Sequence, residues 1–202
     1  MTAPDPVHTL RPRPRSGLWV LGILAFIIAV SAFLPSHVAD VFAYFRSKLP
    51  VEAWRLVSAH LVHLNWQHAL MNALALALLA ALVGRCLTAR QWAWFWFTAS
   101  VFVSVGLWIL LPDLERYVGA SGVLHGVAAL GGIAMFREHR LESVLLLGGL
   151  IVKIGWEVQF GATAATAELI GGNVIEQAHW FGAVYGALVG GIFWAFRRGS
   201  QL

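Results

Sequence analysis

Six apolar stretches, separated by short polar segments, dominate the pattern of hydrophobic and polar positions along the chain. Each is close to the roughly 20 residues that an α-helix needs to cross a bilayer. None shows the alternation of apolar and polar residues that a transmembrane β-strand requires, so we expect helices. The six stretches are Leu18–Leu34, Leu64–Val83, Trp92–Leu111, Ser121–Phe136, Ser143–Phe160 and Ala178–Phe196.

The composition favours a membrane protein over a soluble one. Of the 202 residues, 59% are hydrophobic and 12% are charged, which is more apolar surface than a core of this size can hide. The net charge is +4, but the basic residues are scattered between the apolar stretches, so we expect no nucleic-acid partner. The single cysteine, Cys86, excludes an internal disulfide and a CxxC metal or redox site.

The lysines and arginines predict the orientation in the membrane. Nine of them flank the stretches on one side and four on the other, with Lys153 inside the fifth stretch. Because cytoplasmic loops carry the excess of positive charge, both termini are expected in the cytoplasm. The prediction is an all-α polytopic membrane protein: a Pro/Arg-rich cytoplasmic tail at 1–16, a six-helix domain at 17–197 and a cytoplasmic tail at 198–202. The nine are Arg11, Arg13, Arg15, Arg85, Arg90, Arg137, Arg140, Arg197 and Arg198.

This topology places polar residues of three helices at a similar depth. The second, fourth and sixth stretches all run from outside to inside, so their first residues lie near the outer face. His68 and Asn72 share a face of the second helix, Ser121 opens the fourth, and His179 lies at the start of the sixth. Polar groups in hydrocarbon are costly and often functional. We therefore expect these side chains to belong to one site.

Small residues form a stripe on the fourth and on the sixth helix. Such stripes let membrane helices approach closely. If the two stripes face each other, the parallel helices bring His179 toward Ser121. The stripes consist of Gly122, Gly126, Ala129 and Gly132 on the fourth helix and of Gly182, Gly186 and Gly190, in line with His179, on the sixth.

An imidazole beside a hydroxyl is the minimal activated nucleophile, because the histidine takes the proton and later returns it to the leaving amine. The sequence also offers hydrogen-bond donors for the developing oxyanion. The backbone N–H groups at the start of the helix that Ser121 opens lack partners, and His68 and Asn72 offer side-chain donors. The only acid close in sequence to His179 is Glu176, which we expect to be solvated. The prediction is a Ser–His dyad and not a triad.

Three segments carry a family resemblance. WRLVSAHLVHLNWQHALMN, GASG and AHWFGAVYG resemble the signature segments of rhomboid intramembrane serine proteases, in the family's order. The resemblance covers roughly Trp54 to Gly191. It implies Ser121 as nucleophile, His179 as base, His68 and Asn72 as oxyanion side chains, and Trp54 and Arg55 as structural residues of the first outer loop.

One position departs from many bacterial rhomboids. His125 stands where an aromatic residue often packs under the catalytic histidine, and GASGVLHG is similar to the rhombosortase branch. Those enzymes are associated with exported proteins that carry a C-terminal Gly-Gly motif, an apolar helix and a basic tail. His125 is assigned a supporting role together with Gly119, Gly122 and Gly182, and a rival role as base stays open. The resemblance implies membrane-anchored protein substrates in a bacterial inner membrane, without metal or cofactor.

Two other functions stay open on the residues alone. A transporter or channel would use the buried polar groups as a relay and would show solute flux that survives loss of Ser121. A metal or haem membrane protein would use His60, His63, His68 and His179 as ligands. Neither explains why a Gly-flanked serine opens the fourth helix. The sequence leaves the oligomeric state open.

The remaining polar positions are interpreted structurally. His60 and His63 are expected to be polar interfacial residues that bond the loop. Lys153 and Glu157, at i and i+4, are expected to form an ion pair. The Ala/Thr/Gly-rich segment 161–177 is expected to be a loop that covers the site.

Overall fold

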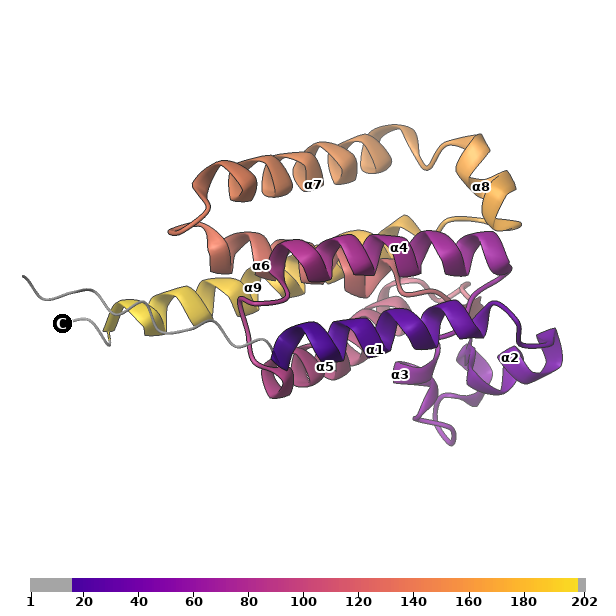
Figure 1. Cartoon of the computed structure of the whole chain (residues 1–202). Helices are drawn as coiled ribbons and strands as arrows, with labels where there is room; N and C mark the ends of the chain where they lie inside the picture. Colours follow the sequence, from indigo (N-terminus) through magenta and orange to yellow (C-terminus); the bar gives the residue numbers. More distant parts are fainter. Residues whose placement is uncertain (1–15, 200–202) are drawn as a thin grey trace, which may run out of the picture.

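The computed structural model describes residues 16–199 and is mostly helical (Figure 1). The tails predicted at 1–16 and 198–202 lie outside the described residues, except that residue 16 begins the first helix and residues 198–199 end the last. The elements in chain order are α1 Ser16–Ser31, α2 Ser36–Phe42, β1 Tyr44–Phe45, the 3₁₀ helix Arg46–Lys48, α3 Arg55–Ser58, α4 Trp66–Val83, α5 Ala89–Leu110, β2 Arg116–Tyr117, α6 Ser121–Met135, α7 Arg140–Phe160, α8 Ala164–Ile170 and α9 Glu176–Gly199.

Each of the six apolar stretches coincides with one long helix: α1, α4, α5, α6, α7 and α9. Capping side chains set some of the starts. The side chain of Asn65 accepts a hydrogen bond from the backbone of His68 and begins α4, and a capping box between Thr88 and Gln91 begins α5. Within the described residues 16–199, three helices, α4, α5 and α9, are long and apolar enough to cross a membrane, while α1 and α6 are apolar but shorter. Six spans and two cytoplasmic termini stay predictions.

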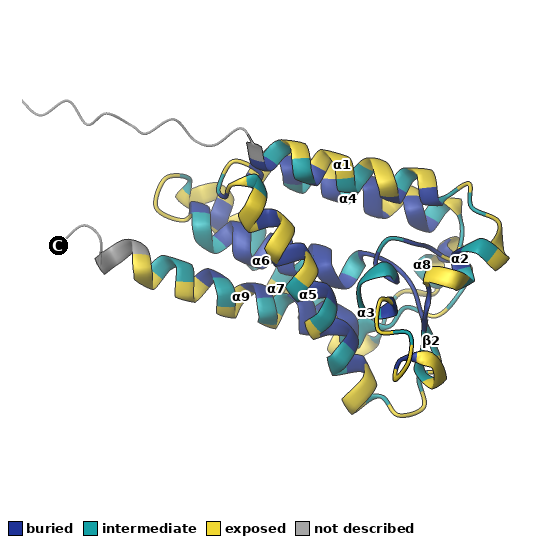
Figure 2. Ribbon diagram, turned by 90° about the horizontal axis from the view of Figure 1, so that it is seen from below, coloured by how far each residue is buried: buried dark blue, intermediate teal, exposed yellow. Residues whose placement is uncertain are grey.

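The central helix is α6, which packs against α4, α5, α7 and α9. Figure 2 shows most of it in the buried colour, since glycines, alanines and aliphatic residues occupy nearly all of its faces. Because lipid-like side chains give no hydrophobic drive between helices in a membrane, close packing has to hold such a bundle together. Ser121, the first residue of α6, is thus fixed by the best-packed helix of the fold.

Glycines set the distance between α6 and α9. A Cβ on Gly182 would lie 1.8 Å from the carbonyl oxygen of Gly122, and one on Gly186 would lie 2.2 Å from that of Gly126. The predicted facing of the two stripes is confirmed at these four positions. It is wrong for Gly132, which contacts a leucine of α7 instead.

A small sheet joins the first loop to the segment before α6. Strands β1 and β2 are antiparallel, with Tyr44 opposite Tyr117. The all-α prediction from the sequence did not include these strands, because strands of two residues are too short to show an alternation of apolar and polar positions. Arg55, 3% exposed, donates to the carbonyls of Asp40 and Ala43 at 2.7 and 2.5 Å. Its implied role in holding the first loop is confirmed.

His60 and His63 are both buried inside the protein, whereas polar interfacial residues would be exposed. Nε2 of His60, 0% exposed, lies 3.0 Å from the hydroxyl of Ser104 on α5. Nδ1 of His63 lies 3.2 Å from the hydroxyl of Ser31 on α1, and its Nε2 accepts from the backbone N–H of Ala120 at 3.4 Å. The loop bonding expected of them is present. It ties the segment between α3 and α4 to the residue before Ser121.

The burial of these two histidines predicts an acid-sensitive fold. Desolvation lowers the pKa of His60 to about 4 and that of His63 well below its usual range. In the unfolded chain these imidazoles are protonated near pH 6.5, whereas in the folded chain they stay neutral to a lower pH. The free energy of unfolding therefore decreases as the pH falls from 6.5 toward 4. We expect His60 alone to cost about 2 to 3 kcal/mol of unfolding free energy between pH 7.5 and 4.5.

Thermal unfolding of detergent-solubilised protein across this pH range measures the effect. His60→Gln keeps an amide that can donate to Ser104 but cannot be protonated, so its unfolding should depend less on pH. An equal pH dependence in both proteins would contradict the prediction.

Candidate active site

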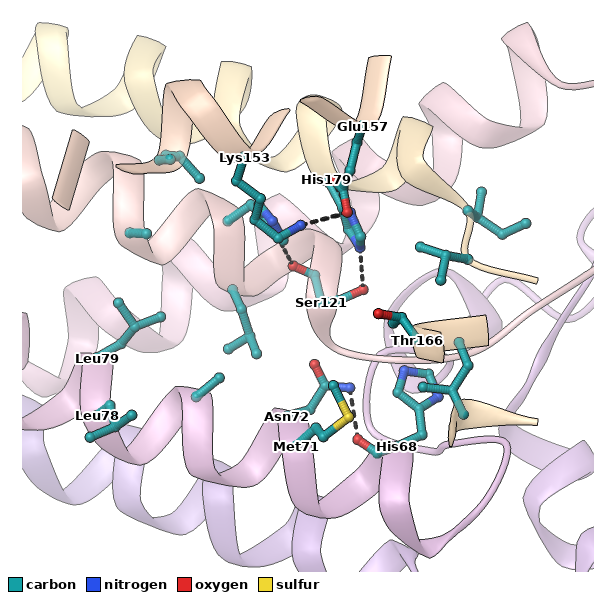
Figure 3. Close-up of a pocket in the computed structure, with 18 of the residues that line it drawn as sticks. His68, Met71, Asn72, Leu78, Leu79, Ser121, Lys153, Glu157, Thr166 and His179 are labelled. Atoms are coloured by element: carbon teal, nitrogen blue, oxygen red, sulfur yellow. Dashed lines mark hydrogen bonds and ion pairs between the residues drawn. The ribbon is translucent and has the colours of Figure 1, made fainter. Parts of the chain in front are cut away.

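A cavity of about 640 Å³ opens between α4 and α7, and residues of α6, α8 and α9 complete its wall (Figure 3). Its polar side chains gather at the end of the bundle where α4, α6 and α9 begin and α7 ends. The remainder of the lining is apolar, with Leu78 and Leu79 of α4 facing the cavity together with Leu145 and Leu146 of α7. One part of the cavity is a polar pocket that contains Ser121 and His179, and the other part is an apolar trough lined by these leucines. Part of the expected covering loop is a helix, α8, which contributes Thr166 to the lining.

Ser121 and His179 meet in the polar pocket. The hydroxyl of Ser121 lies 3.0 Å from Nε2 of His179, and the histidine is 6% exposed. The two residues are 58 positions apart in the sequence. Their side chains meet because α6 and α9 run side by side and pack closely at Gly122 and Gly182. A hydroxyl and an imidazole at this distance can exchange a proton.

An acid also contacts His179, contrary to the expectation that none would. Oε2 of Glu157 on α7 lies 2.8 Å from Nδ1 of His179, and Oε1 of the same carboxylate lies 2.7 Å from Nζ of Lys153. The predicted Lys153–Glu157 ion pair is confirmed, but it has His179 as a third member.

Sequence reasoning missed this contact because it considered only the acid nearest along the chain. That acid, Glu176, accepts a hydrogen bond from the backbone N–H of Ala162 at 2.6 Å instead. The signal that could have found the contact is topological. Glu157 lies about one turn before the end of α7 and His179 about one turn after the start of α9, so antiparallel helices put both at the same end of the bundle.

His125 packs against His179. Its ring stacks on that of His179 with centroids 4.2 Å apart and planes 12° apart. Its Nδ1 lies 2.6 Å from the backbone oxygen of Ser121. Among the contacts of the described residues, the imidazole at the Ser121 hydroxyl is that of His179. His125 thus takes the packing position expected of an aromatic residue there.

His68 and Asn72 line the same cavity from α4 (Figure 3). They are 8% and 6% exposed, and the Asn72 amide donates to the backbone oxygen of His68 at 3.1 Å. Gly119 makes room for the His68 ring: its φ is +120°, and a Cβ there would lie 2.8 Å from Cε1 of that ring. Within the described part of the chain, Nδ1 of His68 has no hydrogen-bond partner. Both side chains therefore line the cavity that also contains Ser121.

The four histidines of the haem or metal alternative do not converge. His60 and His63 bond to other helices, and the described residues close enough to share an ion are His125, Glu157 and His179 instead. The ammonium of Lys153 already pairs with the Glu157 carboxylate and would repel a cation there. The arrangement suits proton transfer better than metal ligation.

Comparison of the sequence with known proteins identifies its family. A rhomboid domain model matches residues 50–196, which is most of the chain. An uncharacterised protein of Mycobacterium tuberculosis is 25% identical over 212 residues, covering 92% of this chain and 78% of its own length. Rhomboid-like protein 11 of the Arabidopsis thaliana chloroplast is 24% identical over 190 residues, covering 89% of this chain and 65% of its own length. The chain belongs to the rhomboid family of intramembrane proteases and is an integral membrane protein.

Proposed function

We propose that this chain is a serine endopeptidase of the rhomboid type, with Ser121 as nucleophile and His179 as general base and acid. The observation that carries the proposal is the 3.0 Å contact between the Ser121 hydroxyl and Nε2 of His179, inside a cavity among the helices of a membrane bundle. Serine is a weak nucleophile until a neighbouring base takes its proton. Rhomboid proteases act on membrane-anchored substrates, and the apolar trough beside the pocket suits such a chain.

The proposed reaction has two halves. Oγ of Ser121 attacks the carbonyl carbon of the scissile peptide bond while its proton passes to Nε2 of His179, and the carbonyl π electrons move to oxygen. His179 then gives this proton to the leaving amine as the C–N bond breaks, which leaves an acyl-Ser121 ester. Water gives a proton to the same Nε2 and attacks the ester; His179 returns this proton to Oγ of Ser121 as the acyl C–O bond breaks, and the product leaves as a carboxylic acid that loses its own proton to solvent.

His68, Asn72 and the backbone N–H of Ser121 would hold the oxyanion. The N–H belongs to the first turn of α6, where the helix offers it no carbonyl. Asn72→Ala should lower kcat by about 10²-fold with little change in KM, because the donor acts mainly in the transition state. Steady-state cleavage of a membrane-anchored substrate in proteoliposomes measures this. Met71→Ala, a neutral lining residue on the same helix, is the control; a loss confined to KM would count against the oxyanion role.

Substrate and branch belong to the same proposal. The unwound part of a substrate would enter the polar pocket and its helical part the trough, and a Gly-Gly junction suits the pocket because glycine is a poor helix former. The segment GASGVLHG supports the rhombosortase branch, and the arginine distribution supports six spans with cytoplasmic termini in a bacterial inner membrane.

A fluorophosphonate serine probe tests the function. The purified protein in detergent should be labelled on Ser121, as located by mass spectrometry, and folded Ser121→Ala and His179→Ala variants should not. His125→Phe is the matched control, because it keeps a stacked ring and removes the rival base. Labelling that survives in His179→Ala but is lost in His125→Phe would overturn the assignment. Solute flux that persists in Ser121→Ala would indicate the transporter alternative.

A further inference from the structure

We propose that Glu157 is a positioning residue that orients His179, so that the site works as a Ser–His–Glu chain. This inference rests on the proposed function. The carboxylate and the hydroxyl occupy opposite nitrogens of one ring: Oε2 of Glu157 is 2.8 Å from Nδ1, and Oγ of Ser121 is 3.0 Å from Nε2. Figure 3 shows the three side chains in line from α7 to α6.

The first contribution of Glu157 is the choice of tautomer. A neutral imidazole carries one proton, and the base must keep Nε2 free to accept from the serine. A carboxylate at Nδ1 accepts a hydrogen bond and so holds the proton there. Lys153 is the competing neighbour, since its Nζ lies 3.5 Å from the same Nδ1. Its 2.7 Å contact to Oε1 of Glu157 is much shorter, so the ammonium supports the carboxylate and leaves Nδ1 to it.

The second contribution is electrostatic. When His179 takes the serine proton, its ring becomes positive in a place where the His179 and Glu157 side chains are only 7% and 12% exposed. Charges that are shielded from water interact more strongly than exposed ones. The carboxylate therefore stabilises the imidazolium that forms on the way to the acyl-enzyme. Removing its charge raises the barrier to the first proton transfer.

The contact also makes the orientation of His179 depend on the position of α7. This helix is lightly packed: among its described residues Ser143 is buried, and its hydroxyl donates to the carbonyl of Gly132 on α6. At the other end of α7 the Glu157 carboxylate makes a shorter polar contact with His179 of α9 than the Lys153 ammonium does. Three glycines of α7 would meet nothing within 4 Å if each carried a Cβ: Gly148, Gly149 and Gly155. His179 therefore keeps its contact with the Glu157 carboxylate only while α7 lies against α9.

Glu157→Gln tests the proposal, because the amide keeps the size and can still accept from Nδ1 but lacks the charge. We expect kcat to fall by about 10²-fold or more, toward the roughly 10⁴-fold effect of neutralising the acid of a triad, with KM unchanged. The rate of fluorophosphonate labelling should fall in parallel. Glu157→Asp should recover part of the loss. The matched control is Glu142→Gln, the same change at a half-exposed carboxylate of α7, which should leave kcat unchanged.

A double-mutant cycle separates positioning from mere anchoring of α7. In a His179→Ala background, Glu157→Gln should slow the residual cleavage of the membrane-anchored substrate no further, because the residue acts through the ring. An equal further loss in that background, an effect on KM or thermal stability alone, or an unchanged kcat would each overturn the proposal. Failure of the proposed function looks different: the unaltered protein would then resist the probe, or Ser121→Ala would still cleave.

Discussion

Replacing Ser121 with alanine should reduce cleavage of a membrane-anchored substrate by about 10⁴- to 10⁶-fold, the scale on which serine proteases lose activity without their nucleophile. The hydroxyl is the only group that the substitution removes, and in the structure it lies 3.0 Å from Nε2 of His179. Alanine is also a good first residue for a helix. The fold should therefore survive while the chemistry stops.

The same loss is expected for His179→Ala, and the double variant should be no worse than either single one, because the two residues act as a unit. A fluorogenic transmembrane peptide in proteoliposomes measures the rates, and a thermal midpoint within about 2 °C of the unaltered protein certifies the fold. If folded Ser121→Ala still cleaved the substrate at more than one-tenth of the original rate, the assignment of Ser121 as the nucleophile would be wrong.

Adding one methyl group at Gly182 should damage both stability and activity. A Cβ there would lie 1.8 Å from the carbonyl oxygen of Gly122, and neither atom belongs to a side chain that can turn aside. Helices α6 and α9 would have to separate by more than about 1 Å. Overpacking of this kind costs about 1 to 3 kcal/mol or more, and a 1 Å misplacement of reacting groups costs about 10²-fold in rate.

Gly191→Ala is the control for Gly182→Ala. Both positions lie on α9, but a Cβ on Gly191 meets nothing within 4 Å. The control should be neutral or more stable by up to about 1 kcal/mol, because alanine is the better helix former. Thermal unfolding and the cleavage assay are read together for the two variants. Equal stability and equal activity in both would refute the close approach of α6 and α9.

Helix positions and faces could be predicted from the sequence because both follow from short-range periodicity. The spacing of Gly182 and Gly186 puts them on one face of α9, and the structure has that face against Gly122 and Gly126. Orientation rules alone also brought Ser121 and His179 to one end of the bundle. The two residues then meet because each lies on the small-residue face of its own helix.

Other features could not be predicted because they depend on which helix lies beside which. His60 looks like a loop histidine in the sequence, yet α5 closes over it and supplies the hydroxyl of Ser104. The pairing of β1 with β2 joins segments some seventy residues apart, Tyr44 and Tyr117, and leaves no local pattern.

The sequence by itself determined six apolar helices, the faces they present and the end of the bundle where the polar residues gather. Periodicity and the charge of flanking residues carry that information, since both act within a few turns of one helix. Only the tertiary structure decided that Glu157 joins His179. An acid becomes a partner through the packing of α7 against α9, which brings the two side chains to 2.8 Å, and no spacing along either helix records that distance.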